Sequence, residues 1–321
     1  MVTATQFAAP MIEATTDAID WEEVPCPLCA HEHWTPFIEA ADNDPRSSGL
    51  RFGIVRCDRC GLRFTNPRPT FESMARFYPA GYAPHRRARL ARRPLRRWFP
   101  LVRLTGRPCP ERRSLPWLGT GRLLDFGCGG GEYLCRMQEQ GWKVTGLDSS
   151  PAVVRDLKEN LGLRAFAGTL PHPQLRPGSF DVVTMWSSLE HVHQPLETLR
   201  AAYQLLMPGG RLYLAVPNID SWPYQWLAHN WFALEVPRHL THFNASSLRT
   251  MLEVAGFQIK TTRMIAHPEW LRQSARIASR AGEATFFHQL LKLKPVARFA
   301  AWMCFLAGQS DCIMAMAERP L

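Results

Sequence analysis

The sequence lacks a hydrophobic run long enough to cross a lipid bilayer. Its longest uncharged apolar stretch near the C-terminus, residues 299–310, has 12 residues, whereas a membrane-spanning helix needs about 20. The first 14 residues contain no basic residue followed by an apolar block, so a secretory signal is not expected either. These absences predict a cytoplasmic protein whose nine cysteines stay reduced unless a metal ion holds them.

Lysine is also scarce, and the positive charge is not spread evenly. Of the 38 basic residues 33 are arginine, and the formal net charge is +10. The segment 85–113 holds eleven of these arginines and one acid, Glu111. This segment therefore accounts for the whole net charge, and positive and negative charges are equal in number in the rest of the chain. This distribution excludes a protein coated with positive charge and favours one local anionic partner, or none.

The arginine-rich segment allows more than one interpretation. Arginines mixed with leucine, tryptophan and phenylalanine resemble a basic amphipathic element, which suits peripheral contact with an anionic membrane surface. Pro94 and Pro100 interrupt any long helix, so a solvated linker is the alternative. A nucleic-acid partner is not expected, because no acceptor-base motif such as Asn-Pro-Pro-Tyr is present.

Length and patterning predict two folded parts. The content of 46% hydrophobic and 21% charged residues is typical of a folded chain, and 321 residues suit two domains. We expect a flexible tail over 1–20, a cysteine-paired module over 21–70, a helical and arginine-rich linker over 71–120, and a core over 121–321.

The core reads as alternating strands and helices. Strands are expected at 123–126, 143–147, 180–186, 211–216, 257–264 and 311–317, and helices at 132–140, 151–161 and 195–207. Alternation of this kind predicts an α/β fold with a doubly wound, mainly parallel sheet. A helical insert at about 266–308, apolar and basic, precedes the last strand and by default packs as core or lid.

A glycine-rich turn follows the first strand of the core. Glycines at 127, 129, 130 and 131 lack Cβ atoms and let a ligand approach the backbone. A dinucleotide site requires a third glycine where Glu132 stands, and Asp125 would repel a pyrophosphate. The same carboxylate would attract the α-ammonium group of S-adenosylmethionine. Asp148, at the end of the next strand, suits two ribose hydroxyls.

On these motifs the chain resembles the class I S-adenosylmethionine-dependent methyltransferases, from Gly121 to about Lys260. The resemblance rests on Leu123–Gly131, Asp148, Phe180–Met185 and the expected turn Leu206–Leu212 before strand five. It implies a Rossmann-like sheet of about seven strands. It also implies cofactor contacts from Asp125, Gly127, Cys128, Gly129, Gly131, Asp148, Ser149, Thr169 and Leu170. Thr169 stands where many relatives carry an acid that contacts adenine, so that contact departs from the family pattern.

Two cysteine pairs, Cys26-x-x-Cys29 and Cys57-x-x-Cys60, predict a metal site. Four thiolates complete the tetrahedral shell of Zn²⁺ and leave no open position, so the site would be structural. A redox pair is the alternative, although neither pair opens a thioredoxin-like unit. The stretch from Cys26 to Pro79 resembles the zinc-ribbon front end of a bacterial methyltransferase subgroup that acts on small molecules, including sugars and secondary metabolites.

Candidates for the chemistry follow strands four and five. Glu190-His191 comes after strand four and matches a pair common in this methyltransferase type, which could serve as orienting acid and base. His239 and His242 follow an aromatic segment, 222–232, that could wall an acceptor pocket or simply pack a lid. The same four side chains could alternatively be structural.

The expected activity is methyl transfer from S-adenosylmethionine to a small-molecule acceptor. The family resemblance slightly favours oxygen over carbon or nitrogen as the acceptor atom, and a sugar, lipid-linked compound or secondary metabolite as the acceptor. Methylation of a sugar or other carbon centre is one alternative. A cofactor-binding scaffold without turnover, contacting a partner through its zinc ribbon, is a rival of a different class.

Overall fold

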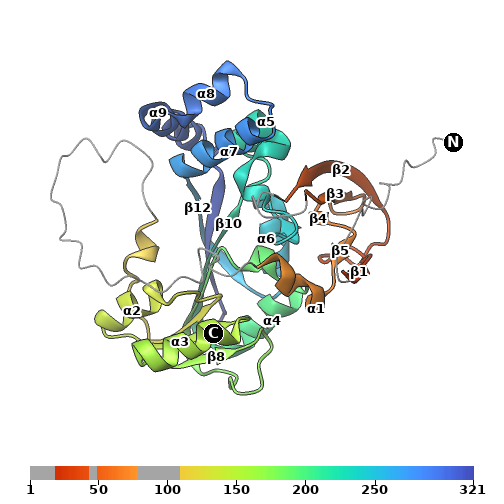
Figure 1. Cartoon of the computed structure of the whole chain (residues 1–321). Helices are drawn as coiled ribbons and strands as arrows, with labels where there is room; N and C mark the ends of the chain where they lie inside the picture. Colours follow the sequence, from red (N-terminus) through yellow and green to blue (C-terminus); the bar gives the residue numbers. More distant parts are fainter. Residues whose placement is uncertain (1–18, 43–48, 79–108) are drawn as a thin grey trace.

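The computed structural model describes residues 19–42, 49–78 and 109–321 (Figure 1). The expected flexible tail and nearly all of the arginine-rich segment lie outside the described residues. In the described part, none of the helices is both long and apolar enough to span a membrane.

A seven-stranded sheet runs through the centre of the molecule in the order β12-β13-β10-β9-β6-β7-β8 (Figure 1). Strand β13 is antiparallel to both of its neighbours, whereas β10, β9, β6, β7 and β8 pair in parallel. The strands are β6 Arg122–Phe126, β7 Lys143–Asp148, β8 Ala165–Ala167, β9 Phe180–Trp186, β10 Leu206–Pro217, β12 Gln258–Ile265 and β13 Cys312–Glu318. The Rossmann-like prediction is confirmed.

Helices cover the two faces of this sheet. Helices α2 (Glu132–Glu139) and α3 (Pro151–Leu161) pack over one core with Leu123 and Val182. Helices α4 (Pro195–Leu205) and α6 (Ala245–Val254) pack over another core, which holds the next strand residues, Leu124 and Val183. Because successive strand residues point to opposite faces, the apolar runs in β6 and β9 feed both cores.

One predicted boundary is wrong. The expected helix 195–207 ends at Leu205, and the expected turn Leu206–Leu212 belongs to β10. Leu206 already pairs with Phe180, and the register then shifts before Arg211 pairs with Val182. Gly209, at φ +76°, accommodates this irregularity, so the sequence signal for a turn marks a bulge within the strand.

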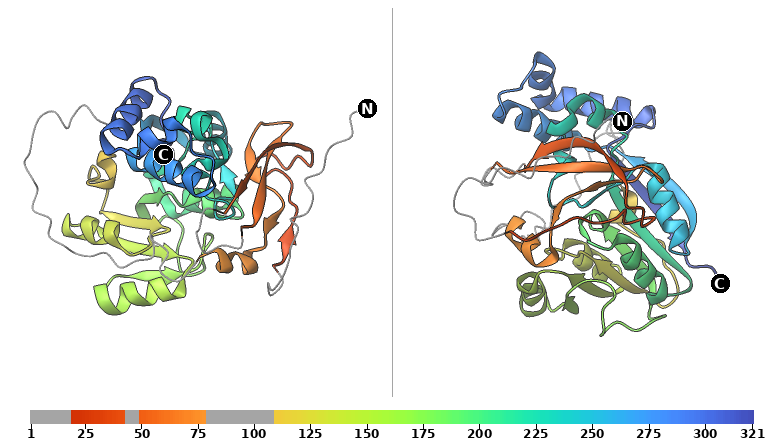
Figure 2. Two further views of the ribbon diagram at one scale, coloured as in Figure 1. Left: turned by 45° about the horizontal axis from the view of Figure 1, so that its top comes forward. Right: turned by 90° about the vertical axis from the view of Figure 1, so that its right-hand side faces the viewer.

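The cysteine-paired module forms a second sheet beside the first (Figure 2). Its order is β11-β4-β3-β2, with β2 Trp34–Ala41, β3 Arg51–Cys57, β4 Arg63–Thr65 and β11 Thr241–His242. A small ladder of β1 (Trp21–Glu22) and β5 (Arg68–Pro69) and the short helix α1 (Phe71–Met74) complete it. Strand β11 comes from the methyltransferase-like part of the chain, so the two parts share one sheet.

The expected helical insert consists of three helices above both sheets (Figures 1 and 2). They are α7 (Pro268–Arg280), α8 (Phe286–Lys292) and α9 (Lys294–Leu306), and α5 (Trp222–Leu227) lies next to them. A third core joins Leu271 and Leu291 of the insert to Phe52 of the cysteine-paired module. Trp231, from the aromatic segment, is fully buried in this core. Five 3₁₀ turns complete the described elements: Ala75–Phe77, Pro110–Arg112, Leu189–His191, Ala228–Asn230 and Phe232–Leu234.

Candidate active site

The strand order reverses between β6 and β9, and this reversal locates the site. Strand β7 lies on one side of β6 and β9 on the other, so the loops after β6 and β9 diverge at their carboxyl ends. Ligands of open α/β sheets bind in the crevice formed by such loops. The glycine-rich turn follows β6, and Ser187–His191 follows β9. Ser187 has φ +51°, a strained left-handed conformation that is often found at functional sites.

The glycine-rich turn lies against the loop after β9. Gly127 has φ +71°, and a Cβ atom there would lie 2.5 Å from the Cβ of Ser188. Gly131 has φ +79°, and its Cβ would lie 2.5 Å from a methyl carbon of Leu157. Side chains are therefore excluded at both ends of the turn. A ligand that approaches the backbone closely requires a turn of this kind.

Asp125 ends β6 as a buried carboxyl group. The hydroxyl of Thr184 donates to its Oδ1 at 2.6 Å. Burial raises the pKa of Asp125 to about 7, although that hydrogen bond and the charge of Arg112 oppose the rise. A buried carboxylate of this kind is stabilised by a cationic ligand group.

Asp148, at the end of β7, organises the turn. Its Oδ2 accepts from the backbone N–H of Gly129 at 2.9 Å, and its Oδ1 accepts from the backbone N–H of Ser150 at 2.9 Å. A carboxylate accepts hydrogen bonds only, so a group of this kind at the end of β7 suits the hydroxyl donors of a ligand. Ser149 beside it is exposed, and Thr169, which follows β8, is half-buried.

Three of the four predicted catalytic side chains come together. One ligating atom each of Glu190, His191 and His239 lies within 4.8 Å of the others. Glu190 is fully buried, and neither of its carboxyl oxygens has a hydrogen-bond partner among the residues that the structure describes. Burial raises the pKa of Glu190 to about 8. Burial also lowers the pKa of His191 to about 3 and that of His239 to about 4, so both imidazoles are neutral at pH 7.

The hydrogen bonds of His239 fix its tautomer. Its Nδ1 lies 2.9 Å from the carbonyl oxygen of Ala233, which can only accept, so Nδ1 carries the proton. Its Nε2 then presents a lone pair, 3.5 Å from Oε2 of Glu235 and 4.0 Å from Oε1 of Glu190. A neutral imidazole with a lone pair beside a carboxylate can accept a proton, because the negative charge of Glu235 would stabilise the resulting imidazolium.

The other two histidines are engaged differently. Nδ1 of His191 lies 2.9 Å from the hydroxyl of Tyr78, and its ring meets that of His239 edge-on at 4.5 Å. His242 is not part of the cluster. It is buried, and its Nε2 lies 3.1 Å from the hydroxyl of Thr65. His242 therefore braces the junction of the two sheets.

Sequence reasoning missed Tyr78 and Glu235 as members of the site. Glu235 and His239 are four residues apart, a spacing that could have suggested contact, and Glu235 adopts φ +40°. Tyr78 has no local signal, because only the docking of the cysteine-paired module on the core brings it to His191. Of the aromatic segment, Trp226 is exposed and Trp231 packs in the third core, so packing explains these two better than a pocket wall.

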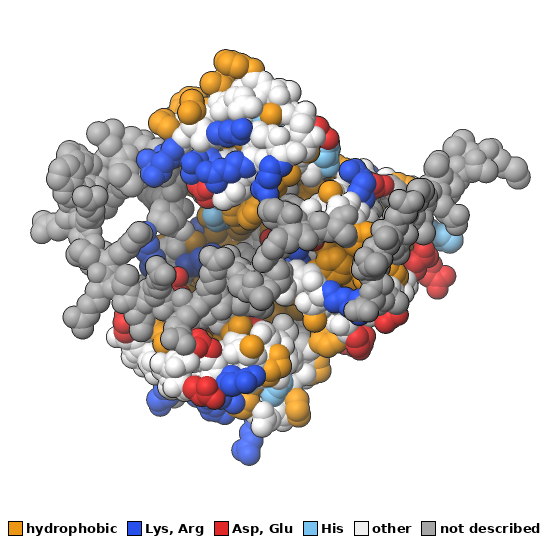
Figure 3. Space-filling view, in the orientation of Figure 1, with side chains coloured by type: hydrophobic (Ala, Val, Ile, Leu, Met, Phe, Trp, Pro, Cys, Tyr) orange, Lys and Arg blue, Asp and Glu red, His pale blue; other side chains and the backbone are white. Residues whose placement is uncertain are grey.

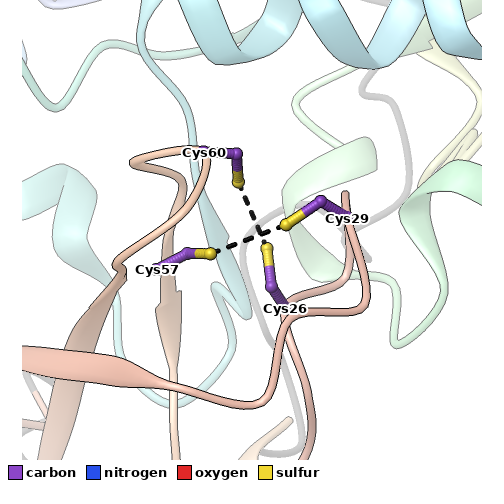
Figure 4. Close-up of side chains that lie close together, drawn as sticks. All are labelled: Cys26, Cys29, Cys57 and Cys60. Carbon is purple, nitrogen blue, oxygen red and sulfur yellow. Dashed lines mark hydrogen bonds between the residues drawn. The ribbon is translucent and has the colours of Figure 1, made fainter.

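The four paired cysteines converge at one point (Figure 4). Sγ of Cys26 lies 3.4 Å from Sγ of Cys60, and Sγ of Cys29 lies 3.6 Å from Sγ of Cys57. All four are free thiols within 4.8 Å of one another. A tetrahedral Zn²⁺ with Zn–S bonds of about 2.3 Å sets sulfurs about 3.8 Å apart, so this donor set fits zinc.

Comparison with known proteins agrees with this geometry. A family model described as a methyltransferase domain matches residues 82–262, more than half of the chain. The chain belongs to this methyltransferase family. The ubiquinone biosynthesis O-methyltransferase of Xanthomonas euvesicatoria is 31% identical over 175 residues, which cover 51% of this chain and 73% of the relative. The enzyme of the same name from Xanthomonas campestris is 31% identical over 171 residues, covering 50% and 71%.

Solved structures include a similar chain. An S-adenosylmethionine-dependent methyltransferase from Mesorhizobium loti is 21% identical, with a TM-score of 0.46 over 65% of this chain and 96% of that one. The family membership and the named relatives confirm the resemblance inferred from the sequence. The protein is an S-adenosylmethionine-dependent methyltransferase, and the predicted enzyme class is confirmed.

Proposed function

We propose that this methyltransferase methylates a hydroxyl group of a small molecule, with His239 as the general base. The observation that carries the proposal is the unshared Nε2 lone pair of His239 beside Glu190 and Glu235, close to the strand reversal. The relatives named above are O-methyltransferases, which also favours oxygen as the acceptor atom.

The residues of the crevice fit the cofactor. The side-chain-free turn at Gly127 and Gly129 would receive it, Asp125 would bind its α-ammonium group, and Asp148 would bind its ribose hydroxyls. Thr169 and Leu170 are proposed to face the adenine. When bound, S-adenosylmethionine supplies a methyl group on a positively charged sulfur that leaves as the neutral thioether.

The protein's own residues then orient the acceptor and take up its proton. With the cofactor bound, the acceptor oxygen would receive its methyl group, and Nε2 of His239 would take up the hydroxyl proton. The carboxylate of Glu235 would stabilise the imidazolium that forms. His191, held by Tyr78, touches the ring of His239 edge-on and so positions it.

The cysteine cluster is proposed to hold a structural zinc ion. Its four thiols fill a tetrahedral shell, and the distances between sulfurs match that geometry. The ion would join the hairpin of β3 and β4 to the turn before β2, and so hold the sheet that β11 completes. Zinc analysis of the purified chain should find one ion per molecule, lost on Cys57→Ser.

Labelled methyl transfer tests the proposed reaction. The chain is incubated with methyl-labelled S-adenosylmethionine and a metabolite extract, and labelled small molecules are examined for a new O-methyl group by mass spectrometry. His239→Asn keeps a donor for the carbonyl of Ala233 but removes Nε2, so kcat should fall about 10²- to 10⁴-fold. His242→Gln, which keeps a polar contact to Thr65, is the matched control and should retain most activity.

Two results would contradict this assignment. Label found on carbon would replace O-methylation by C-methylation. Equal turnover by His239→Asn and the unmodified chain, with cofactor affinity unchanged, would remove His239 as the base.

A further inference from the structure

The outer surface of the helical insert exposes many large hydrophobic side chains. Six of the twelve large hydrophobic side chains that are exposed in the described residues lie between 286 and 306. They are Phe286, Phe287, Leu293, Phe299, Met303 and Leu306. A concentration of this kind on one end of a molecule marks an interaction surface, because scattered single exposed side chains are the norm.

Helix α9 is apolar on both of its faces. Its inner face packs small buried residues, Ala297, Ala301 and Cys304, into the insert. Its outer face carries Phe299, Trp302, Met303 and Leu306, whose spacing of three and four residues forms one stripe along the helix. Phe299 and Leu306 are 61% and 62% exposed. A helix that is apolar all round is normally covered on every side.

The apolar surface continues onto α8 and α5. Phe286, at the first position of α8, is 78% exposed, and Leu293 is exposed in the turn between α8 and α9. The ring of Phe287 contacts that of Trp226 from α5, with centroids 5.9 Å apart. We call the exposed apolar residues of α8, α9 and their turn, with Trp226, the insert face.

The charged residues within the stretch that carries α8 and α9 are all positive. Between Thr285 and Gly308 the chain carries Lys292, Lys294 and Arg298 and no acidic residue. Figure 3 shows hydrophobic side chains at the end of the molecule where α8 and α9 lie, with Lys and Arg side chains directly below them. An apolar tip with a basic rim behind it matches an anionic lipid surface, in which apolar side chains enter the acyl region and basic ones reach the phosphates.

We propose that the insert face docks the enzyme on the surface of a bilayer that contains anionic lipid. A second copy of the chain fits less well, because a two-fold contact would set Lys292, Lys294 and Arg298 against a surface with the same charges. Docking here is separate from the arginine-rich segment, which lies elsewhere in the sequence. It would bring an acceptor dissolved in or attached to the membrane to the enzyme.

Flotation of the full chain with vesicles tests the proposal. We expect binding to vesicles of equal parts phosphatidylglycerol and phosphatidylcholine, much weaker binding to phosphatidylcholine alone, and a decline at high salt. Phe299→Ser with Leu306→Ser should weaken binding at least about tenfold. Val254→Ser, an exposed apolar position on α6, is the matched control and should change nothing.

The charged rim is tested in the same way. Lys292→Gln with Lys294→Gln should weaken binding roughly 25-fold, or about fivefold for each lysine, since one basic residue near an anionic surface is worth about 1 kcal/mol. Arg200→Gln with Arg249→Gln, exposed on α4 and α6, removes the same charge from another face and should have little effect on binding.

Two outcomes would overturn the proposal. Binding that is unchanged in both insert variants must come from another part of the chain. A dimer in sedimentation velocity that Phe299→Ser with Leu306→Ser dissociates, without vesicle binding by the unmodified chain, would show that a second copy covers the face. Because these substitutions are at exposed positions, thermal unfolding should confirm that every variant is folded.

Discussion

Thr65 of the cysteine-paired module donates its hydroxyl to the backbone carbonyl of His239, at 2.8 Å. The same oxygen lies 3.1 Å from Nε2 of His242. One buried side chain from the N-terminal sheet therefore holds both ends of the segment that presents the proposed base. The module thus contacts the candidate active site, so the zinc ion proposed for it would have a consequence for catalysis.

Loss of zinc should impair catalysis more than cofactor binding. Cys57 is the last residue of β3, which pairs with β4. Strand β4 in turn pairs with β11 beside His239. Cys57→Ser, or a chelator, should lower kcat about tenfold or more while the affinity for S-adenosylhomocysteine stays within about twofold. Steady-state kinetics and calorimetry measure the two effects.

The matched control for this experiment is Cys135→Ser. Cys135 is a half-buried thiol on α2, distant in sequence from the cluster and without ligand spacing. It should leave zinc content and kcat unaltered. Full activity of a zinc-free chain would show that the module needs no metal to hold the site.

Glu190→Gln should stabilise the protein without cofactor, and increasingly so as pH rises. Burial raises the pKa of Glu190 from its ordinary 4.5 to about 8, so the unfolded chain ionises first. The wild-type fold therefore loses stability between pH 4.5 and 8, by on the order of a few kcal/mol, and the glutamine variant does not.

Thermal unfolding at a series of pH values measures this difference. The melting temperatures should nearly coincide at pH 5 and separate to a maximum near pH 8. Glu159→Gln, exposed on α3, should show no such divergence. A constant difference at all pH values would mean that Glu190 does not change its charge in this range.

Gly127→Ala should abolish cofactor binding, whereas Gly162→Ala should not. Both glycines have positive φ, +71° and +63°, so an alanine is strained at either position. Only at Gly127 would the new methyl group collide, 2.5 Å from the Cβ of Ser188, whereas nothing lies within 4 Å at Gly162. Calorimetry with S-adenosylhomocysteine should show no binding to the first variant and ordinary binding to the second. Equal affinities would place the cofactor elsewhere.

The parts of the fold that depend on local pattern could be predicted from the sequence. The strand at 180–186 and the helix at 151–161 have the expected bounds. An apolar run marks the strand, and an N-terminal serine cap and a glycine after the last turn mark the helix. The four cysteines could be grouped since spacing alone defines a metal-binding pair. The turn expected at Leu206–Leu212 was wrong because a bulge within a strand and a turn use the same types of residue.

The parts that depend on long-range docking could not be predicted. Strand β11 has two residues and no alternating pattern, so its pairing with β4 is visible only in three dimensions. The sequence suggested an acid–base pair of Glu190 with the adjacent His191. The structure also brings His239 to Glu190, from the segment between β10 and α6. Chemistry-bearing residue types were recognisable, but their partners were not.

Cofactor affinity should depend on pH through Asp125. Burial raises the pKa of this carboxyl group to about 7, and only its ionised form attracts the α-ammonium group of the ligand. Between pH 6 and 8 the ionised fraction rises about tenfold, so the affinity for S-adenosylhomocysteine should rise by a similar factor and then level off. Asp125→Asn should bind about 10- to 100-fold more weakly at pH 8 and show no pH dependence in this range.

Asp148→Asn separates this effect from a general loss of binding. Removing that carboxylate should weaken affinity at every pH through the lost ribose contacts. It should also shift the midpoint of the pH dependence downward, because the charge of Asp148 is one of the causes that raise the pKa of Asp125. An affinity of the unmodified chain that is flat from pH 6 to 8, or an Asp125→Asn variant that binds equally well, would mean that Asp125 does not receive the ammonium group.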